Sequence, residues 1–177
     1  MKKNKILTIP NLLSLLRLAM IPLLLWLYLE KDAYLLTAAV VVLSAITDIV
    51  DGIIARKYDL ISDLGKALDP VADKLTQIAM LYCLGTTFPE IQILLVILVL
   101  KEVITGIMSL VSIRKTGKVE GAQWHGKVTT VLLYAMIIDR IVPWLFSAVL
   151  TVTCAGMMVF SMVMYWKHNW KSIKDEA

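Results

Sequence analysis

Residues 48–73 read DIVDGIIARKYDLISDLGKALDPVAD and come just after the apolar run 38–46. An ionisable side chain in such an apolar segment is costly unless it is paired or bound to a metal. The stretch places acids, an arginine and glycines at set offsets, in the pattern D-x2-D-G-x2-A-R-x8-G-x3-D-x3-D. Its positions are filled by Asp48, Asp51, Gly52, Ala55, Arg56, Gly65, Asp69 and Asp73. This combination predicts membrane helices that carry a site with several carboxylates.

The spacing of the four acids predicts two pairs that share a helix face. Residues three or four apart lie on the same side of a helix, which pairs Asp48 with Asp51 and Asp69 with Asp73. Four converging carboxylates would repel one another, and a hard divalent cation, Mg2+ or Mn2+, is their natural counter-charge. Four carboxylates suffice for a site with two ions. The alternative interpretation is a loop of solvated acids interleaved with the basic residues Arg56, Lys57, Lys66 and Lys74.

The composition indicates an integral membrane protein. Apolar residues make up 59% of the chain and charged residues 18%, whereas soluble domains carry roughly 25% charged residues. A length of 177 residues suits a single domain over 1–177. Cys83 and Cys154 lie in apolar runs without the spacing of a metal or redox site, so both are interpreted as packing residues.

Six segments are candidates to cross a bilayer, because each is near the roughly 20 residues that a span requires. They cover residues 11–29, 34–55, 64–87, 91–113, 124–141 and 144–166. The fifth has the weakest signal, since its purely apolar part is short and its start carries His125 and Lys127. We therefore predict an all-α integral membrane protein with six transmembrane helices. Residues 3–10 are expected to form a short interfacial segment on the membrane surface, with a frayed terminus as the alternative.

The basic residues predict the orientation in the membrane. Only Lys31 and Arg140 lie in the loops of one side. The other side collects Lys2, Lys3, Lys5, Arg56, Lys57, Lys66, Arg114, Lys115, Lys118, Lys127, Lys167, Lys171 and Lys174. By the positive-inside rule, both termini and the carboxylates lie on the cytoplasmic side of the cell membrane, at the cytoplasmic face of a multi-pass protein. The net charge of +4 comes from these basic residues, which are expected to contact anionic lipid headgroups. No nucleic-acid binding is therefore expected.

The pattern in residues 48–73 resembles, at every position, the signature of the CDP-alcohol phosphotransferase family. This resemblance implies that two Mg2+ or Mn2+ ions are held by the first three motif acids, Asp48, Asp51 and Asp69. Asp73 would contact metal and also act as the general base that takes the proton from the attacking hydroxyl. The resemblance further implies a homodimer and a reaction that displaces CMP from CDP-diacylglycerol. The CDP head group would be bound by Asp51, Gly52, Ala55, Arg56, Gly65 and Asp69.

Two further stretches bear on the acceptor alcohol. Residues 9–17, IPNLLSLLR, and residues 69–74, DPVADK, are similar to both phosphatidylglycerophosphate synthases and cardiolipin synthases of this superfamily. The former commonly carry Arg-Glu in the fourth helix and Gly-Lys-x-Lys-Thr before the fifth. This chain has Lys101-Glu102, and Thr129 replaces one lysine in residues 126–130. The expected acceptor is glycerol 3-phosphate, giving phosphatidylglycerophosphate, and the alternative is a cardiolipin synthase that uses phosphatidylglycerol.

A phosphorylated acceptor requires charge-assisted donors, for which Lys101, Arg114 and Lys127 are the candidates. Lys101 lies about halfway along an apolar run, next to Glu102. Neighbours on a helix point about 100° apart, so these two side chains need not pair. Simple positive-inside residues are the alternative interpretation of Arg114 and Lys127. A divalent-cation transporter is the alternative outside enzymes, since carboxylates within a membrane also line ion paths.

Overall fold

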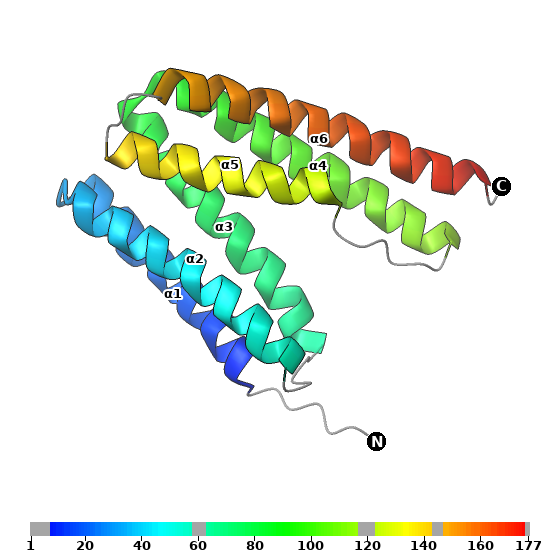
Figure 1. Cartoon of the computed structure of the whole chain (residues 1–177), viewed down its shortest axis with the longest axis horizontal. Helices are drawn as coiled ribbons and strands as arrows, with labels where there is room; N and C mark the ends of the chain where they lie inside the picture. Colours follow the sequence, from blue (N-terminus) through cyan, green and yellow to red (C-terminus); the bar gives the residue numbers. More distant parts are fainter. Residues whose placement is uncertain (1–7, 58–62, 117–122, 143–146, 176–177) are drawn as a thin grey trace. The chain divides into compact units, whose positions relative to one another are not determined.

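A computed structural model describes residues 8–57, 63–116, 123–142 and 147–175. These residues form six helices, as Figure 1 shows. They are α1 (Ile9–Leu29), α2 (Tyr34–Lys57), α3 (Asp63–Thr87), α4 (Pro89–Thr116), α5 (Trp124–Ile141) and α6 (Ser147–Asp175). The all-helical prediction is confirmed, and each predicted segment coincides with one helix. The sixth helix extends further than predicted, to Asp175.

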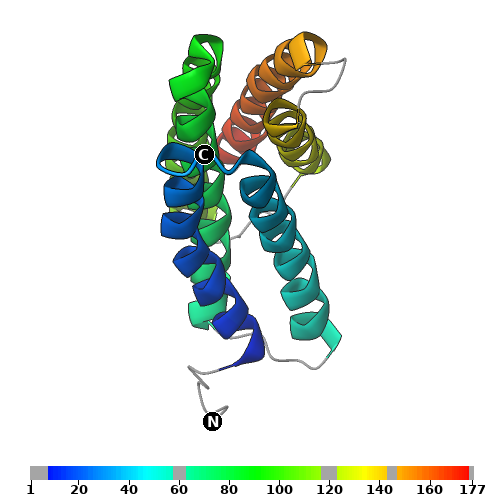
Figure 2. The same ribbon diagram turned by 90° about the vertical axis from the view of Figure 1, so that its left-hand side faces the viewer.

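Local interactions define where α1 begins and where it turns back into α2. The hydroxyl of Thr8 caps α1 by accepting a hydrogen bond from the backbone N–H of Asn11 at 3.4 Å. The turn after α1 contains Asp32 in the left-handed region, with φ +48°, which aspartate tolerates better than most residues. The hydroxyl of Tyr34 donates to the Asp32 carboxylate at 3.1 Å. This short turn lets α1 and α2 pack side by side as a hairpin (Figure 2).

Pro70 lies inside α3 and does not end it. The sequence allows a proline that terminates or kinks the helix, or one in its first turn, whereas α3 begins at Asp63 and continues to Thr87. Proline has no N–H, so position 70 cannot donate to the carbonyl four residues earlier. The helix therefore lacks this one backbone hydrogen bond at Pro70 and still continues through Asp73.

The chain divides into two compact units, Met1–Cys83 and Leu84–Ala177. The first unit contains α1, α2 and most of α3. In the second unit, α6 packs against both α4 and α5. Its core is made of fully buried aliphatic and methionine side chains from these three helices, including Leu94, Leu98, Met136, Ile137 and Met158.

Four of the described helices are long and apolar enough to cross a membrane. The spans are Pro10–Leu29, Tyr34–Ile54, Pro89–Arg114 and Ser147–His168. α3 and α5 fall outside this group, and both carry charged residues within their lengths. This is a membrane protein, while six spans stay a prediction. The predicted interfacial segment 3–10 lies mostly outside the described residues.

Apolar side chains also point outward from the helices. Leu35, Val131 and Val152 are each more than two-thirds exposed. Large exposed apolar surfaces are unusual in soluble monomers, and in a bilayer such side chains contact lipid. Val131 belongs to α5, so the outer surface of this helix also suits a lipid environment.

Candidate active site

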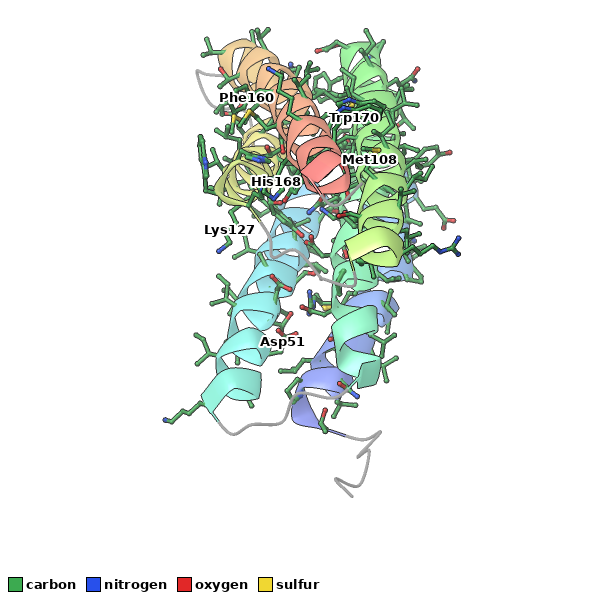
Figure 3. All side chains as sticks on the ribbon, turned by 90° about the vertical axis from the view of Figure 1, so that its right-hand side faces the viewer. Asp51, Met108, Lys127, Phe160, His168 and Trp170 are labelled. Atoms are coloured by element: carbon green, nitrogen blue, oxygen red, sulfur yellow. The ribbon has the colours of Figure 1, made fainter. Side chains whose placement is uncertain are left out.

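Three motif carboxylates converge in the first unit. Asp48 and Asp51 come from α2, and Asp69 comes from α3. One oxygen from each lies within 4.8 Å of the others. Asp51 is 3% exposed, and Figure 3 shows it on the inner side of α2. The predicted pairing of Asp48 with Asp51 on one helix face matches this arrangement, because both reach the same point.

Arg17 from α1 occupies the centre of these carboxylates. Its Nη1 donates to Asp48, and its Nη2 donates to both Asp51 and Asp69. The arginine is 2% exposed, and a buried charge requires such partners. Within the described part of the chain, Nε has no hydrogen-bond partner. Arg17 therefore joins α1 to the carboxylates of α2 and α3.

Sequence reasoning missed this role of Arg17. In the sequence, Arg17 is the last residue of the stretch 9–17, and that stretch indicates no partner for it. The available signal was that Arg17 is the one charged residue in the sequence of α1. An isolated basic residue in an apolar membrane helix is expensive and requires a partner.

Asp73 lies one turn after Asp69 on α3, beside the group of three. The side-chain amide of Gln77 donates to Asp73 Oδ2 at 2.9 Å, and Lys74 Nζ lies 3.9 Å from the same oxygen. Asp69 and Asp73 are four residues apart on α3, so the fourth carboxylate lies on the same helix face as a member of the cluster. Gln77 is 1% exposed and was also missed, although a spacing of four residues places it on the same helix face as Asp73.

The donor set fits a hard divalent cation. Mg2+ and Mn2+ prefer oxygen ligands, and Asp48, Asp51 and Asp69 each offer an oxygen toward one point. Their three negative charges exceed the single positive charge of Arg17 by two. These three residues could hold a cation of charge +2. The part of Asp73 in metal binding stays a prediction.

The remaining positions of the motif flank the carboxylates along the chain. Gly52 directly follows Asp51 on α2, and Gly65 precedes Asp69 by one turn of α3. Ala55 and Arg56 lie in the last part of α2, but their side chains are outside the described part of the structure. Binding of CDP by these residues therefore stays a prediction.

The three candidate acceptor residues belong to the second unit. Lys101 on α4 is 6% exposed, and its Nζ lies 2.6 Å from Glu102 Oε1, so the two neighbours do pair. Arg114 at the end of α4 and Lys127 in the first turn of α5 are exposed. Figure 3 shows Lys127 pointing away from α5. Lys101 thus already has a carboxylate partner, whereas the other two side chains are accessible.

Thr129, which replaces a lysine of the related synthases, is a packing residue. It is 2% exposed, and its hydroxyl donates to the carbonyl of His125 at 2.8 Å. The same hydroxyl lies 3.4 Å from the carbonyl of Met157 on α6. Position 129 therefore faces the contact between α5 and α6.

His125 connects the same two helices. Its ring is fully buried, with Nδ1 2.9 Å from Ser161 Oγ and Nε2 3.0 Å from Gln123 Oε1. The ring also meets Tyr165 edge to face, with centroids 4.6 Å apart. Both ring nitrogens are engaged within the protein, so His125 stabilises the helix contact.

Replacing His125 with alanine is expected to destabilise the protein by about 2 to 4 kcal/mol. The change leaves a cavity and removes the partners of Ser161 and Gln123. The measurement is the thermal unfolding midpoint in detergent. Val128→Ala, at a 40% exposed position of α5, is the control and should change stability by less than about 1 kcal/mol. Equal midpoints for the two variants would show that His125 makes no special contribution.

Comparisons with known proteins match most of the chain to one family. The family model described as CDP-alcohol phosphatidyltransferase matches residues 7–166. A cardiolipin synthase (CMP-forming) of Streptomyces coelicolor is 43% identical over 104 residues, which cover 55% of this chain and 46% of that protein. A CDP-diacylglycerol--glycerol-3-phosphate 3-phosphatidyltransferase of Rickettsia bellii is 49% identical over 69 residues, covering 38% of each chain. These matches cover less than half of the length of either relative.

Proposed function

The chain belongs to the CDP-alcohol phosphatidyltransferase family, a family of phospholipid-synthesising transferases, and on this premise we propose its reaction. The protein transfers the phosphatidyl group of CDP-diacylglycerol to glycerol 3-phosphate, which forms phosphatidylglycerophosphate and releases CMP. The observation that carries this proposal is the convergence of Asp48, Asp51 and Asp69 from two helices.

The residues of the first unit suit such a displacement. The hydroxyl oxygen of the acceptor forms a bond to the phosphorus of the phosphatidyl group. The bond between that phosphorus and the bridging oxygen of the diphosphate breaks. CMP leaves with this oxygen. Asp73 takes the proton of the hydroxyl as general base, while Gln77 holds its carboxylate through the 2.9 Å hydrogen bond.

Asp48, Asp51 and Asp69 would hold the Mg2+ or Mn2+ ions, with Asp73 contributing to the second. Bound divalent cations neutralise a diphosphate and stabilise the leaving phosphate. Gly52 and Gly65 have no side chains and would therefore let the CDP head group approach the backbone. Arg56, with Ala55 one residue before it, offers a fork of donors for the diphosphate.

The proposed setting is the cytoplasmic face of the cell membrane, with six spans and both termini on that side. The exposed Arg114 and Lys127 belong to the basic side. On the other side, Arg140 is paired with Glu90 at 3.1 Å, which lowers the uncompensated positive charge there. The family model runs through both compact units, which supports one functional domain over 1–177. A homodimer is proposed from the family resemblance alone.

Two alcohols are candidates for the acceptor of the phosphatidyl group. The Rickettsia relative is named for glycerol 3-phosphate, and the Streptomyces relative is named cardiolipin synthase. The exposed basic residues favour glycerol 3-phosphate, which carries about two negative charges. Thr129 in place of a lysine favours the cardiolipin synthase alternative, in which phosphatidylglycerol is the acceptor. Family membership favours either enzyme over a divalent-cation transporter.

The deciding experiment supplies purified protein with CDP-diacylglycerol, Mg2+ or Mn2+, and each acceptor in turn. CMP release reports the reaction, and thin-layer chromatography identifies the lipid. Phosphatidylglycerophosphate from glycerol 3-phosphate is the expected product. Formation of cardiolipin from phosphatidylglycerol, without a product from glycerol 3-phosphate, would overturn the assignment of glycerol 3-phosphate as acceptor. The proposed phosphatidyl transfer from CDP-diacylglycerol would still hold. Cation flux into proteoliposomes without CMP release would contradict the assignment of this protein as an enzyme.

Replacing Lys127 with alanine is expected to raise the KM for glycerol 3-phosphate by roughly tenfold or more. A lost charge-assisted hydrogen bond to phosphate costs about 1.5 to 3 kcal/mol. The KM for CDP-diacylglycerol should change little. Arg114→Ala and Lys101→Ala are measured in parallel, and Lys31→Ala, an exposed lysine of the other side, is the control. Unchanged acceptor KM in all three variants would remove these residues from the acceptor site.

A further inference from the structure

Arg17 stands where a bound cation would be needed. Its Nη2 donates to both Asp51 Oδ2 and Asp69 Oδ1, so this one nitrogen lies between oxygens from α2 and α3. Asp51 and Asp69 are also two of the three residues that would hold a cation. Guanidinium and metal ion therefore compete for one place, and their positive charges also repel each other.

The charges near the site show what the competition requires. Three carboxylates surround one guanidinium, and Asp73, the fourth acid of the motif, follows Asp69 by one turn of α3. Two divalent cations would balance all four acids and leave the charge of Arg17 without a partner. A buried guanidinium without an anion is strongly unfavourable. With two divalent cations bound, Arg17 would therefore move to another anion.

The Arg17 side chain has a donor available for a second anion. Its Nε is buried and has no hydrogen-bond partner among the described residues, so part of its donor set is unused in contact with the carboxylates. Guanidinium groups bind phosphate oxygens through two parallel hydrogen bonds. The diphosphate of the donor lipid would supply such oxygens.

We infer that Arg17 competes with the divalent cations for Asp48, Asp51 and Asp69 and moves to the diphosphate of the donor, where it acts as a donor-binding residue. This inference rests on the metal assignment of the proposed function. Arg17 then weakens metal binding in the free enzyme and makes metal and donor binding mutually supportive. Such a coupling is reciprocal, because each ligand changes the affinity for the other by the same factor.

The test measures Mn2+ binding rather than turnover. Free Mn2+ is counted by electron paramagnetic resonance, with purified wild-type protein, Arg17→Gln and Arg17→Lys in detergent. Each titration is done with and without CDP-diacylglycerol, and no acceptor is added. Arg140→Gln is the matched control, because Arg140 is a mostly buried arginine of the second unit that pairs with Glu90.

Without the donor lipid, Arg17→Gln is expected to bind Mn2+ roughly tenfold tighter than wild type, which corresponds to about 1.4 kcal/mol. CDP-diacylglycerol should tighten Mn2+ binding in wild type and do so less in Arg17→Gln. Arg17→Lys retains the charge without the two-nitrogen fork, so its affinity should lie between the other two. Arg140→Gln should lower stability and leave the Mn2+ affinity unchanged.

The outcomes separate this inference from the proposed function. Equal or weaker Mn2+ binding by Arg17→Gln would overturn the competition and leave Arg17 as a support for the carboxylates. If Arg17→Gln does not fold, Arg17→Lys decides, and an affinity no higher than that of wild type overturns the inference. No Mn2+ binding by wild type, with or without the donor, would instead overturn the metal assignment itself.

Discussion

Asp51→Asn is expected to lower CMP release by about 10^2- to 10^3-fold, which is the range for loss of a group that stabilises transition-state charge. Asparagine retains the shape of aspartate and removes the negative charge that would bind a cation. The same result is expected for Asp48→Asn and Asp69→Asn, because the three carboxylates converge on one point. The measurement is the CMP release rate over a series of Mg2+ concentrations.

The control for these variants is Asp32→Asn. Asp32 is exposed in the turn between α1 and α2, and asparagine also tolerates its positive φ. This variant should retain wild-type activity. All four proteins should be extracted in detergent as folded protein, which a thermal unfolding scan verifies. Near wild-type activity of one cluster variant at low Mg2+ would remove that residue from the metal site.

Asp73→Asn is expected to lower CMP release by ~10^2 to 10^4, the range for a lost general base. The amide oxygen of asparagine can still accept the hydrogen bond from Gln77, so the side chain should remain in place. Binding of CDP-diacylglycerol should persist, because the group of three carboxylates does not include Asp73. Single-turnover CMP release and a separate binding titration with CDP-diacylglycerol distinguish the two properties.

Two results would change the role of Asp73. Loss of CDP-diacylglycerol binding without a separate defect in the chemical step would make this residue a pure metal ligand. Unchanged CMP release would exclude it from both roles. The comparison with Asp69→Asn is informative, since the two residues are one helical turn apart and differ in their contacts: Asp69 binds Arg17, whereas Asp73 accepts from Gln77.

The helices and the motif were predictable from local properties of the chain. Apolar runs of about 20 residues predict helices in a membrane protein, and six helices are found at the predicted places. The spacing of Asp48 and Asp51 places them on one face through the helical repeat alone. Composition also identified the membrane class, since its apolar and charged fractions need no knowledge of packing.

The partners of the buried polar residues depended on the tertiary structure. Arg17 meets Asp48, Asp51 and Asp69 across 31, 34 and 52 positions of the chain, and no local repeat relates such distant residues. In the sequence, His125 and Thr129 lie among polar residues near the start of α5. In the structure, both pack against α6. The sequence by itself determined which residues share a helix face, because 3.6 residues per turn is a local property. Which helices those faces meet was decided only by side-chain packing and by the cost of burying an unpaired charge.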